Sequence, residues 1–177
     1  MASSGPPGTR SLKRHAALIP LSRDHHFALM QALSLIRSHG ASTAARREVA
    51  EAFLAYYEEE LVGHMADEEA ALVPAASSIL GEEAGRLLAE HEDLRARSAE
   101  LQRSLSDDAL LQEQLPALGQ RLHDHVRFEE RVFFERVQER LTAEALEDLG
   151  RAIEAHREAR GRRPGCAMVP PNLKPAR

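Results

Sequence analysis

Apolar residues recur every three or four positions along most of this chain, a spacing that places them on one face of an α-helix. The first such run follows Pro20, where Ser22 is placed to cap a helix that Gly40 would end after Ser38. The predicted buried face of this helix consists of Leu18, Leu21, His25, Leu29, Ala32, Leu33 and Ile36.

Three longer runs predict helices at about 43–72, 81–105 and 116–141, with the polar segment 104–108 as a connection. Pro116 either begins the last of these helices or kinks a longer one. We prefer the first alternative, because proline lacks the N–H that a helix interior needs. A fifth, shorter helix should follow Thr142 as N-cap and run to about Arg160. Its apolar face comprises Leu146, Leu149 and Ile153.

This pattern predicts an all-α fold, an antiparallel up-down four-helix bundle with an additional short C-terminal helix that packs across one side. The composition agrees, since only 4% of the residues are aromatic while strong helix formers are abundant. We expect one bundle at 15–160, flanked by a flexible N-terminal arm at 1–14 and a flexible C-terminal tail at 161–177.

The charge distribution and the two end segments of the chain indicate which binding partners and which cellular location to expect. The 23 basic and 28 acidic residues are dispersed, and the basic segment 156–165 is short and lacks aromatic residues, so we expect no nucleic-acid partner. No run approaches the ~18 apolar residues of a membrane span, and the first ten residues contain no signal-like apolar segment. Cys166 is the single cysteine, which suits a reducing compartment. We therefore expect a cytoplasmic protein without membrane association.

Charged and polar residues interrupt the apolar faces at matching places. The face of the second helix holds His64 and Glu68, and that of the fourth holds His125 and Glu129. His91 lies on the face of the third helix, and the first helix offers either His25 or His26. The candidate residues for an inward-facing site are therefore His25, His26, His64, Glu68, His91, His125 and Glu129.

Two buried carboxylates need compensation, since burying an ionised carboxylate costs several kcal/mol unless it is paired or binds a metal. No lysine lies on these faces, and Arg95, Arg127 and Arg131 fall on other faces. A bound cation is therefore the better explanation. Histidine and carboxylate together suit iron or manganese, whereas structural zinc sites usually include cysteine, so iron is preferred over manganese or zinc.

Four segments resemble the hemerythrin-like HHE cation-binding domains. They are RDHHFAL at 23–29, HMADEEAAL at 64–72, AEHEDL at 89–94 and HVRFEE at 125–130. The resemblance covers roughly residues 15–160 and implies a four-helix bundle around a non-heme di-iron site that binds dioxygen. It implies four terminal histidines and two bridging carboxylates, namely His25 or His26, His64, His91, His125, Glu68 and Glu129.

Two positions stay open under this resemblance. Glu130 is the alternative to Glu129, since some members place the carboxylate one residue later. In the first helix the acidic residue before His25 favours that histidine, while Leu29 three residues after His26 favours the other. Helical periodicity prefers His25, because the face of His26 also carries arginines.

One departure from the family affects the expected function. Oxygen-carrying hemerythrins have a second histidine one turn before the one matching His91, and this chain has Leu87 there. One of two iron ions should then have an open or water-filled position or use another side chain. This favours binding or sensing of dioxygen, nitric oxide or peroxide over reversible oxygen carriage. The alternatives are a di-iron enzyme with peroxidase-like, Fe(II)-oxidising or iron-handling activity, and a metal-free helical interaction module.

The remaining histidines and acidic runs have no such support. His15, His39, His123 and His156 are expected at the surface. The acidic residues Glu58, Glu59, Glu60 and Glu69 are typical of a solvated helix face and are given no role.

Overall fold

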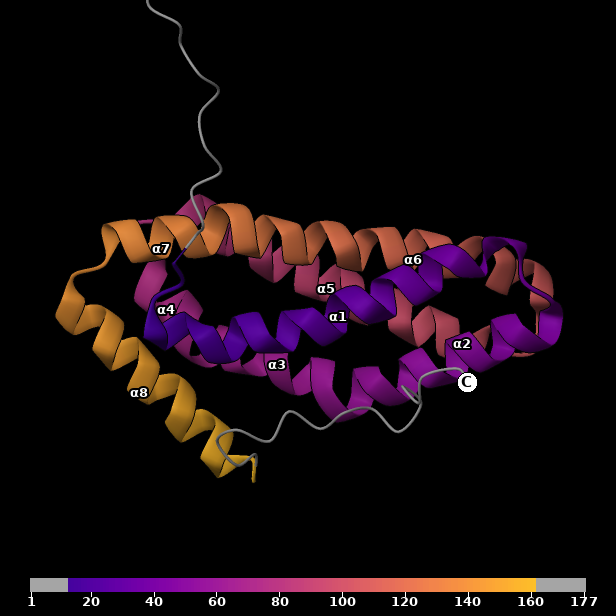
Figure 1. Ribbon diagram of the computed structural model, residues 1–177, viewed down its shortest axis with the longest axis horizontal. Coiled ribbons are helices and arrows are strands. Elements are labelled where there is room, and N and C mark those ends of the chain that lie inside the picture. The colour runs from indigo at the N-terminus through magenta and orange to yellow at the C-terminus, as the bar shows by residue number, and fades with distance from the viewer. Residues whose placement is uncertain (1–12, 162–177) are drawn as a thin grey trace, which may run out of the picture.

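The computed structural model describes residues 13–161, and in this part of the chain every regular element is helical (Figure 1). Four long helices and one shorter helix follow one another. Their elements are η1 (Ala16–Leu18), α1 (Ile19–Arg37), η2 (Ser38–Gly40), α2 (Thr43–Tyr56), η3 (Tyr57–Leu61), α3 (Val62–Asp67), η4 (Glu68–Leu72), α4 (Val73–Ala76), α5 (Gly81–Arg103), α6 (Asp108–Phe128), η5 (Glu129–Phe133), α7 (Phe134–Arg140) and α8 (Ala143–Ala159).

The long helices lie side by side and alternate in direction, which confirms the predicted antiparallel bundle (Figure 1). The second long helix comprises α2 to α4 and the fourth comprises α6 to α7, each continuous through π-helical segments. The helix α8 crosses one end of the bundle at an angle, and it contacts η1, α3 and η4. Its start after the Thr142 cap is as predicted, because the Thr142 hydroxyl accepts the Ala145 N–H.

The first helix begins earlier than the sequence pattern suggested. A short 3₁₀ turn starts after His15, whose ring nitrogen accepts the Ala17 N–H, and α1 continues from Ile19. Ser22 therefore lies within the helix and is not its N-cap. Pro20 fits in the first turn because the nitrogens there have no intrahelical partner.

Proline positions also misled the prediction of the fourth helix. The helix starts at Asp108, with the side chain of Asp107 accepting the N–H groups of Ala109 and Leu110. Pro116 lies inside it, so the preferred start at this residue was wrong and the longer helix is observed. Double capping at the N-terminus and burial of the preceding apolar residues offset the hydrogen bond that the proline omits.

Two apolar clusters fill the bundle, one toward each end. The first cluster includes Ala32, Leu35, Phe53, Met65, Leu94, Leu101, Leu118 and Leu122. The second includes Leu18, Leu21, Leu72, Leu87, Phe133, Phe134, Leu149 and Ile153. Each long helix passes from one cluster to the other, and α8 adds its apolar face to the second. A polar layer separates the two clusters and is the position of the site.

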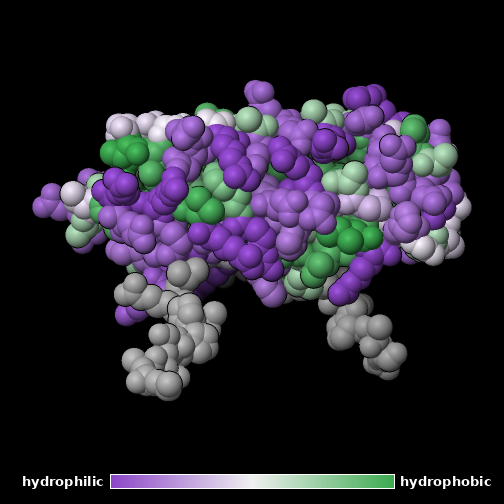
Figure 2. Space-filling view, turned by 90° about the horizontal axis from the view of Figure 1, so that it is seen from above, coloured by the Kyte–Doolittle hydropathy of each residue, from purple (hydrophilic) through white to green (hydrophobic). Residues whose placement is uncertain are grey.

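Figure 2 shows one face of the molecule, which is mainly hydrophilic and carries apolar side chains only as small separate patches. None of the described helices is long and apolar enough to cross a membrane. Cys166 and most of the expected terminal arm and tail lie outside the described residues.

Candidate metal centre

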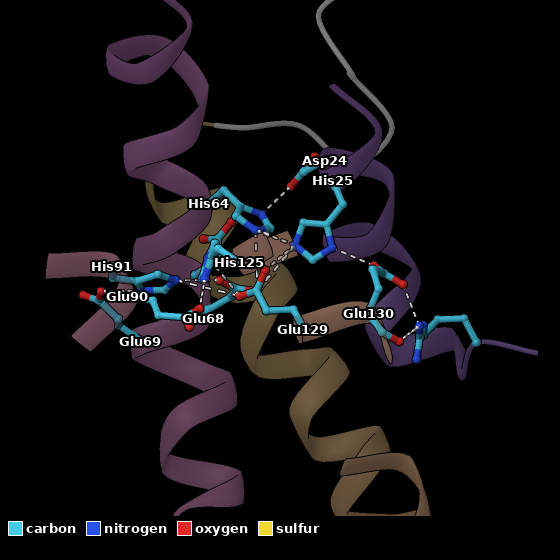
Figure 3. Close-up of polar contacts among 12 residues, drawn as sticks. Asp24, His25, His64, Glu68, Glu69, Glu90, His91, His125, Glu129 and Glu130 are labelled. Atoms are coloured by element: carbon cyan, nitrogen blue, oxygen red, sulfur yellow. Dashed lines mark hydrogen bonds and ion pairs between the residues drawn. The ribbon is translucent and has the colours of Figure 1, made fainter. Parts of the chain in front are cut away.

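Six buried side chains form the polar layer between the apolar clusters (Figure 3). Each of these residues as a whole is at most 3% exposed, and each of the four long helices contributes at least one. They are His25 from α1, His64 and Glu68 from α3 and η4, His91 from α5, and His125 and Glu129 from α6 and η5. The structure thus brings together all but one of the predicted site residues.

A π-helical segment follows each inner carboxylate position. Glu68 begins the segment Glu68–Leu72, and Glu129 begins the segment Glu129–Phe133. The preceding turns are α-helical, so His64 and Glu68 share a face at four-residue spacing, as do His125 and Glu129. The wider π turn then changes the direction of the residues that follow, a device frequent at functional sites.

The six residues form two groups that share both carboxylates. One group is His25, His64, Glu68 and Glu129, and the other is His91, His125, Glu68 and Glu129. Within each group, one potential ligand atom per residue lies within 4.8 Å of the others. The two groups therefore offer the same set of donors, two imidazoles and two carboxylates.

Each shared carboxylate divides its oxygens between the groups. Glu68 Oε1 lies 3.5 Å from His64 Nε2, and Glu68 Oε2 lies 3.3 Å from His91 Nε2. Glu129 Oε2 lies 3.0 Å from His25 Nε2, and its Oε1 lies 3.3 Å from His125 Nε2. This is the arrangement that two bridging carboxylates need.

Most of the inner atoms lack hydrogen-bond partners; the exceptions are Nε2 of His25 and Nε2 of His64, which lie 3.0 Å from each other. Both oxygens of Glu68, both oxygens of Glu129, and Nε2 of His91 and of His125 are buried without one. Buried polar atoms are rarely left in this condition, because each loses its hydration without compensation. Unpartnered oxygen and imidazole donors that converge on two points fit a pair of cations.

The outer nitrogen of each inner histidine does have a partner, and in every case it is a carboxylate. His25 Nδ1 lies 2.6 Å from Glu130, and His91 Nδ1 lies 2.8 Å from Glu69. The other two pairs are His64 with Asp24 at 3.2 Å and His125 with Glu90 at 2.9 Å. A carboxylate accepts the Nδ1–H, which leaves the Nε2 lone pair pointing toward the centre.

In the absence of metal, the charges within this layer shift the pKa values of its histidines. Burial alone lowers the pKa of His25, but the carboxylates of Glu129, Glu130 and Glu68 outweigh it and raise this pKa to about 10. Burial is likewise outweighed at His91, whose pKa rises to about 11 next to Glu129, Glu68 and Glu69. Metal binding must therefore displace protons from these histidines.

The acidic partners shift in the opposite direction. Burial raises the pKa of Glu130, but its contacts with His25 and the charge of Arg14 lower it to about 2. Burial also opposes ionisation of Glu129, whose pKa nevertheless falls well below its usual range because His125 and His25 lie beside it. Glu129 is thus held in the ionised form that a cation requires, and Glu130 is held in the ionised form that accepts from His25.

The structure bears on three details that the sequence interpretation raised. His26 is exposed and lies outside both groups, whereas His25 is buried in one of them, so the two alternatives for the first helix differ clearly in position. Glu130 contacts the outer side of His25 and belongs to neither group. Leu87 is fully buried in the second apolar cluster, and the equal donor sets do not single out one group as less complete.

Sequence reasoning missed several acidic residues around the site. Glu69, expected on a solvated face, contacts His91, and His156, expected at the surface, is half-buried and bonds to Asp67 at 2.8 Å. Asp24, which contacts His64, and Glu90, which contacts His125, had no predicted role in the site. A signal was present, because an acidic residue precedes both His25 and His91, and a second glutamate follows both HxxxE spacings.

Comparison with known families agrees with this geometry. The family model described as hemerythrin HHE cation binding domain matches residues 17–137, which include all six inner residues. Searches of curated proteins and of solved structures gave no match.

Proposed function

The chain belongs to the hemerythrin HHE cation-binding domain family, and we propose that its polar layer holds two iron ions at which dioxygen or a related small ligand binds. In this proposal His25 and His64 serve one ion, and His91 and His125 serve the other. Glu68 and Glu129, which belong to both groups, would serve both ions. Nitric oxide and peroxide are the related ligands.

The observation that carries this proposal is the division of carboxylate oxygens between two histidine pairs. Glu68 and Glu129 are both fully buried, and neither has a hydrogen-bond partner for its oxygens. A single cation would leave the oxygens on its far side uncompensated. Two cations would compensate both pairs of oxygens at once.

Iron is supported by the chemistry of the donors. The set mixes imidazole with carboxylate, which suits iron and manganese, and it contains no cysteine. Two bound iron ions would supply open coordination positions and accessible oxidation states for a small ligand. Manganese and zinc remain the less favoured ions.

The chain itself orients the donors and excludes water. The carboxylates at each Nδ1 hold the ring direction before any ion arrives, and they fix the tautomer once the Nε2 proton has been displaced. The ring of Phe134 stacks on His25 at a centroid distance of 5.3 Å, and Leu87 and Leu21 close the layer from the same end. A small apolar ligand suits such surroundings better than a large or charged one.

The test is anaerobic reconstitution of the full chain with Fe(II), followed by measurement of iron per chain and of the ultraviolet-visible spectrum before and after oxygen is admitted. About two irons per chain and new oxygen-dependent charge-transfer bands are expected. Steady turnover of peroxide or of added Fe(II) would instead favour the di-iron enzyme. A chain that retains no iron would favour the metal-free interaction module.

A matched pair of variants makes this test specific. Glu68→Gln should lose the bridging charge and with it both irons or the oxygen-dependent bands. Glu59→Gln removes an exposed glutamate two turns earlier in the same helix and should retain both. Equal iron retention in the two variants would contradict the proposed role of Glu68.

A further inference from the structure

The surroundings of the two histidine pairs follow one repeated pattern. Each inner histidine contacts a carboxylate through Nδ1, and each of these carboxylates contacts an arginine. The four chains of contacts are His25–Glu130–Arg14, His64–Asp24–Arg157, His91–Glu69–Arg95 and His125–Glu90–Arg86. Up to the carboxylates, the two halves of the centre are equivalent.

The arginines break this equivalence. Arg86 and Arg95 both belong to α5, one of the four helices that form the centre, and their side chains are 54% and 36% exposed. Arg14 and Arg157 come from outside the four long helices, from the segment before η1 and from α8, and they are only 11% and 13% exposed. The half formed by His25 and His64 is therefore completed by chain segments that the other half does not need.

Arg157 is the main link between α8 and this half. Its Nη2 lies 2.5 Å from Asp24, the partner of His64, and its Nε lies 2.9 Å from Asp67. Asp67 is fully buried, and it immediately precedes the bridging residue Glu68. One guanidinium thus bridges two carboxylates that adjoin the centre.

The end of α8 is held at the same point by two further contacts. His156 and Arg160 both reach Asp67, and Arg160 also crosses over Gly63, where a side chain would obstruct it. Gly63 directly precedes His64 in α3. The last turn of α8 is therefore packed against the segment that presents His64 and Glu68.

We propose that α8 is a functional part of the His25–His64 half of the centre and that Arg157 is a positioning residue for the ion bound there. This inference rests on the proposed binding of two metal ions. Arg157 holds Asp24 against His64, and Asp24 in turn holds the imidazole with Nε2 facing the centre. Docking of α8 therefore sets the affinity of this position, whereas the carboxylate and arginine partners of His91 and His125 lie outside α8.

Two consequences follow from this arrangement. Removing a partner that orients a histidine ligand typically weakens metal binding about 10–100-fold, so loss of Arg157 should weaken one of the two binding steps only. Because coupling between two equilibria is reciprocal, an ion bound at the His25–His64 position must also strengthen the docking of α8. The docking of α8 then reports whether the His25–His64 position is occupied.

The experiment is a titration of the metal-free full chain with Fe(II) under anaerobic conditions, with bound iron measured by equilibrium dialysis. Wild type should bind two irons. Arg157→Gln should bind one with wild-type affinity and the second about 10–100-fold more weakly. Arg151→Gln, on the exposed side of the same helix, should bind both as wild type does.

Two more variants separate positioning from a general effect on folding. Arg95 is the corresponding arginine of the other half. Arg95→Gln should weaken iron binding at the His91–His125 position, and Fe(II) should still slow amide exchange in α8. Arg157→Lys keeps the charge but cannot bridge Asp24 and Asp67 with one compact ammonium group, so it should fold and still show the weakened step. An unchanged far-ultraviolet helical signal verifies folding in each case.

Hydrogen exchange of α8 gives a readout independent of any activity. Adding Fe(II) to wild type should slow amide exchange in Ala143–Ala159, and this slowing should be absent or reduced in Arg157→Gln. Three results would each overturn the inference. In the first, Arg157→Gln would bind both irons with wild-type affinity, and in the second it would fold and yet lose both irons. In the third, amide exchange in α8 of the wild type would be the same with and without Fe(II). A wild-type chain that binds no iron would overturn the proposed function as well, and the two failures are thereby distinguished.

Discussion

Oε1 of Glu68 lies 3.5 Å from Nε2 of His64, one helical turn earlier, and the two side chains are 0% and 4% exposed. The same relationship joins Glu129 to His125 at 3.3 Å. An acid and an imidazole this close and this deeply buried stabilise a bundle poorly by themselves, because desolvation of the charges offsets much of their attraction. Their pairing on the second and fourth long helices, which run in the same direction in the bundle, is better explained by ion binding.

Metal binding should stabilise the fold, because its donors converge only in the folded chain. At a free metal concentration of about 100 times Kd, one site adds about 2.7 kcal/mol, which corresponds to a rise in Tm of roughly 5–10 °C for a chain of this size. Thermal melts followed by circular dichroism, with and without Fe(II) under anaerobic conditions, measure this rise. Addition of a chelator should reverse it, and equal Tm values in both states would contradict a metal-linked fold.

The neighbouring histidines of α1 should behave differently when replaced. His25→Gln removes a buried donor, so the variant should retain at most one iron and lose the oxygen-dependent bands. His26→Gln changes an exposed side chain outside both groups and should keep both irons, with a stability change within about 0.5 kcal/mol. Iron analysis of the two purified variants decides the matter, and the reverse result would mean that His26 is the donor.

The stability of the metal-free chain should fall as the pH rises above neutrality. The pKa of His25 is raised from 6.5 to about 10 and that of His91 to about 11. A raised pKa means that the folded state binds the proton more tightly, so this stabilisation is full below about pH 6.5 and is lost as the pH rises through 10 and 11. Urea unfolding in the presence of a chelator at several pH values between 6.5 and 10 measures the trend.

A variant of the same site tests the cause of this pH dependence. Glu129 is the carboxylate that acts most strongly on His25, so Glu129→Gln should flatten the decline between pH 6.5 and 10. In wild type, metal binding should also release protons and become tighter with rising pH, because the ion competes with protons for the same imidazoles. Stability that stays constant across this pH range in the wild-type chain would speak against the protonated histidines.

Replacing either of two glycines with alanine should change the free energy of unfolding, with opposite signs at the two positions. A Cβ on Gly119 in α6 would lie 2.7 Å from the carbonyl oxygen of Ala32 and 2.8 Å from Leu35 Cβ, so α1 and α6 pack too closely to admit it. Gly119→Ala should therefore destabilise the chain by about 1–3 kcal/mol. Gly85 in α5 has no atom within 4 Å of such a Cβ, and Gly85→Ala should stabilise by about 0.5–1 kcal/mol. Urea unfolding of both variants measures the difference in sign.

Helical periodicity predicted the inner residues correctly because these residues lie at α-helical spacing from the apolar residues of the same face. His64 and Glu68 share an α-helical face with apolar neighbours, and so do His125 and Glu129. Periodicity also preferred His25 to His26, and the structure places only His25 in a potential metal group. The same reasoning failed at Glu69, because the π turn that begins at Glu68 departs from the α-helical period and turns Glu69 toward His91.

Other features depend on contacts between distant segments and could not be derived from local pattern. Asp24, one residue before His25, orients His64 on another helix, and the arginine that holds Asp24 lies 133 positions further along the chain. The sequence placed Arg157 near the end of a short amphipathic helix without indicating which residues it would reach. Pro116 misled the prediction of a helix start, because the capping by Asp107 outweighs the one hydrogen bond that a proline omits.

The sequence by itself determined the helices, their buried faces, and the presence of histidines and carboxylates on those faces, because these depend on side-chain spacing within about four residues. Only the tertiary structure decided how the six side chains divide into two groups with shared carboxylates. It also decided that α8 and the segment before η1 supply arginines to one group and α5 supplies them to the other. The reason is that burial and electrostatic compensation act through space between helices, and no spacing along one helix encodes which charge will lie across from another.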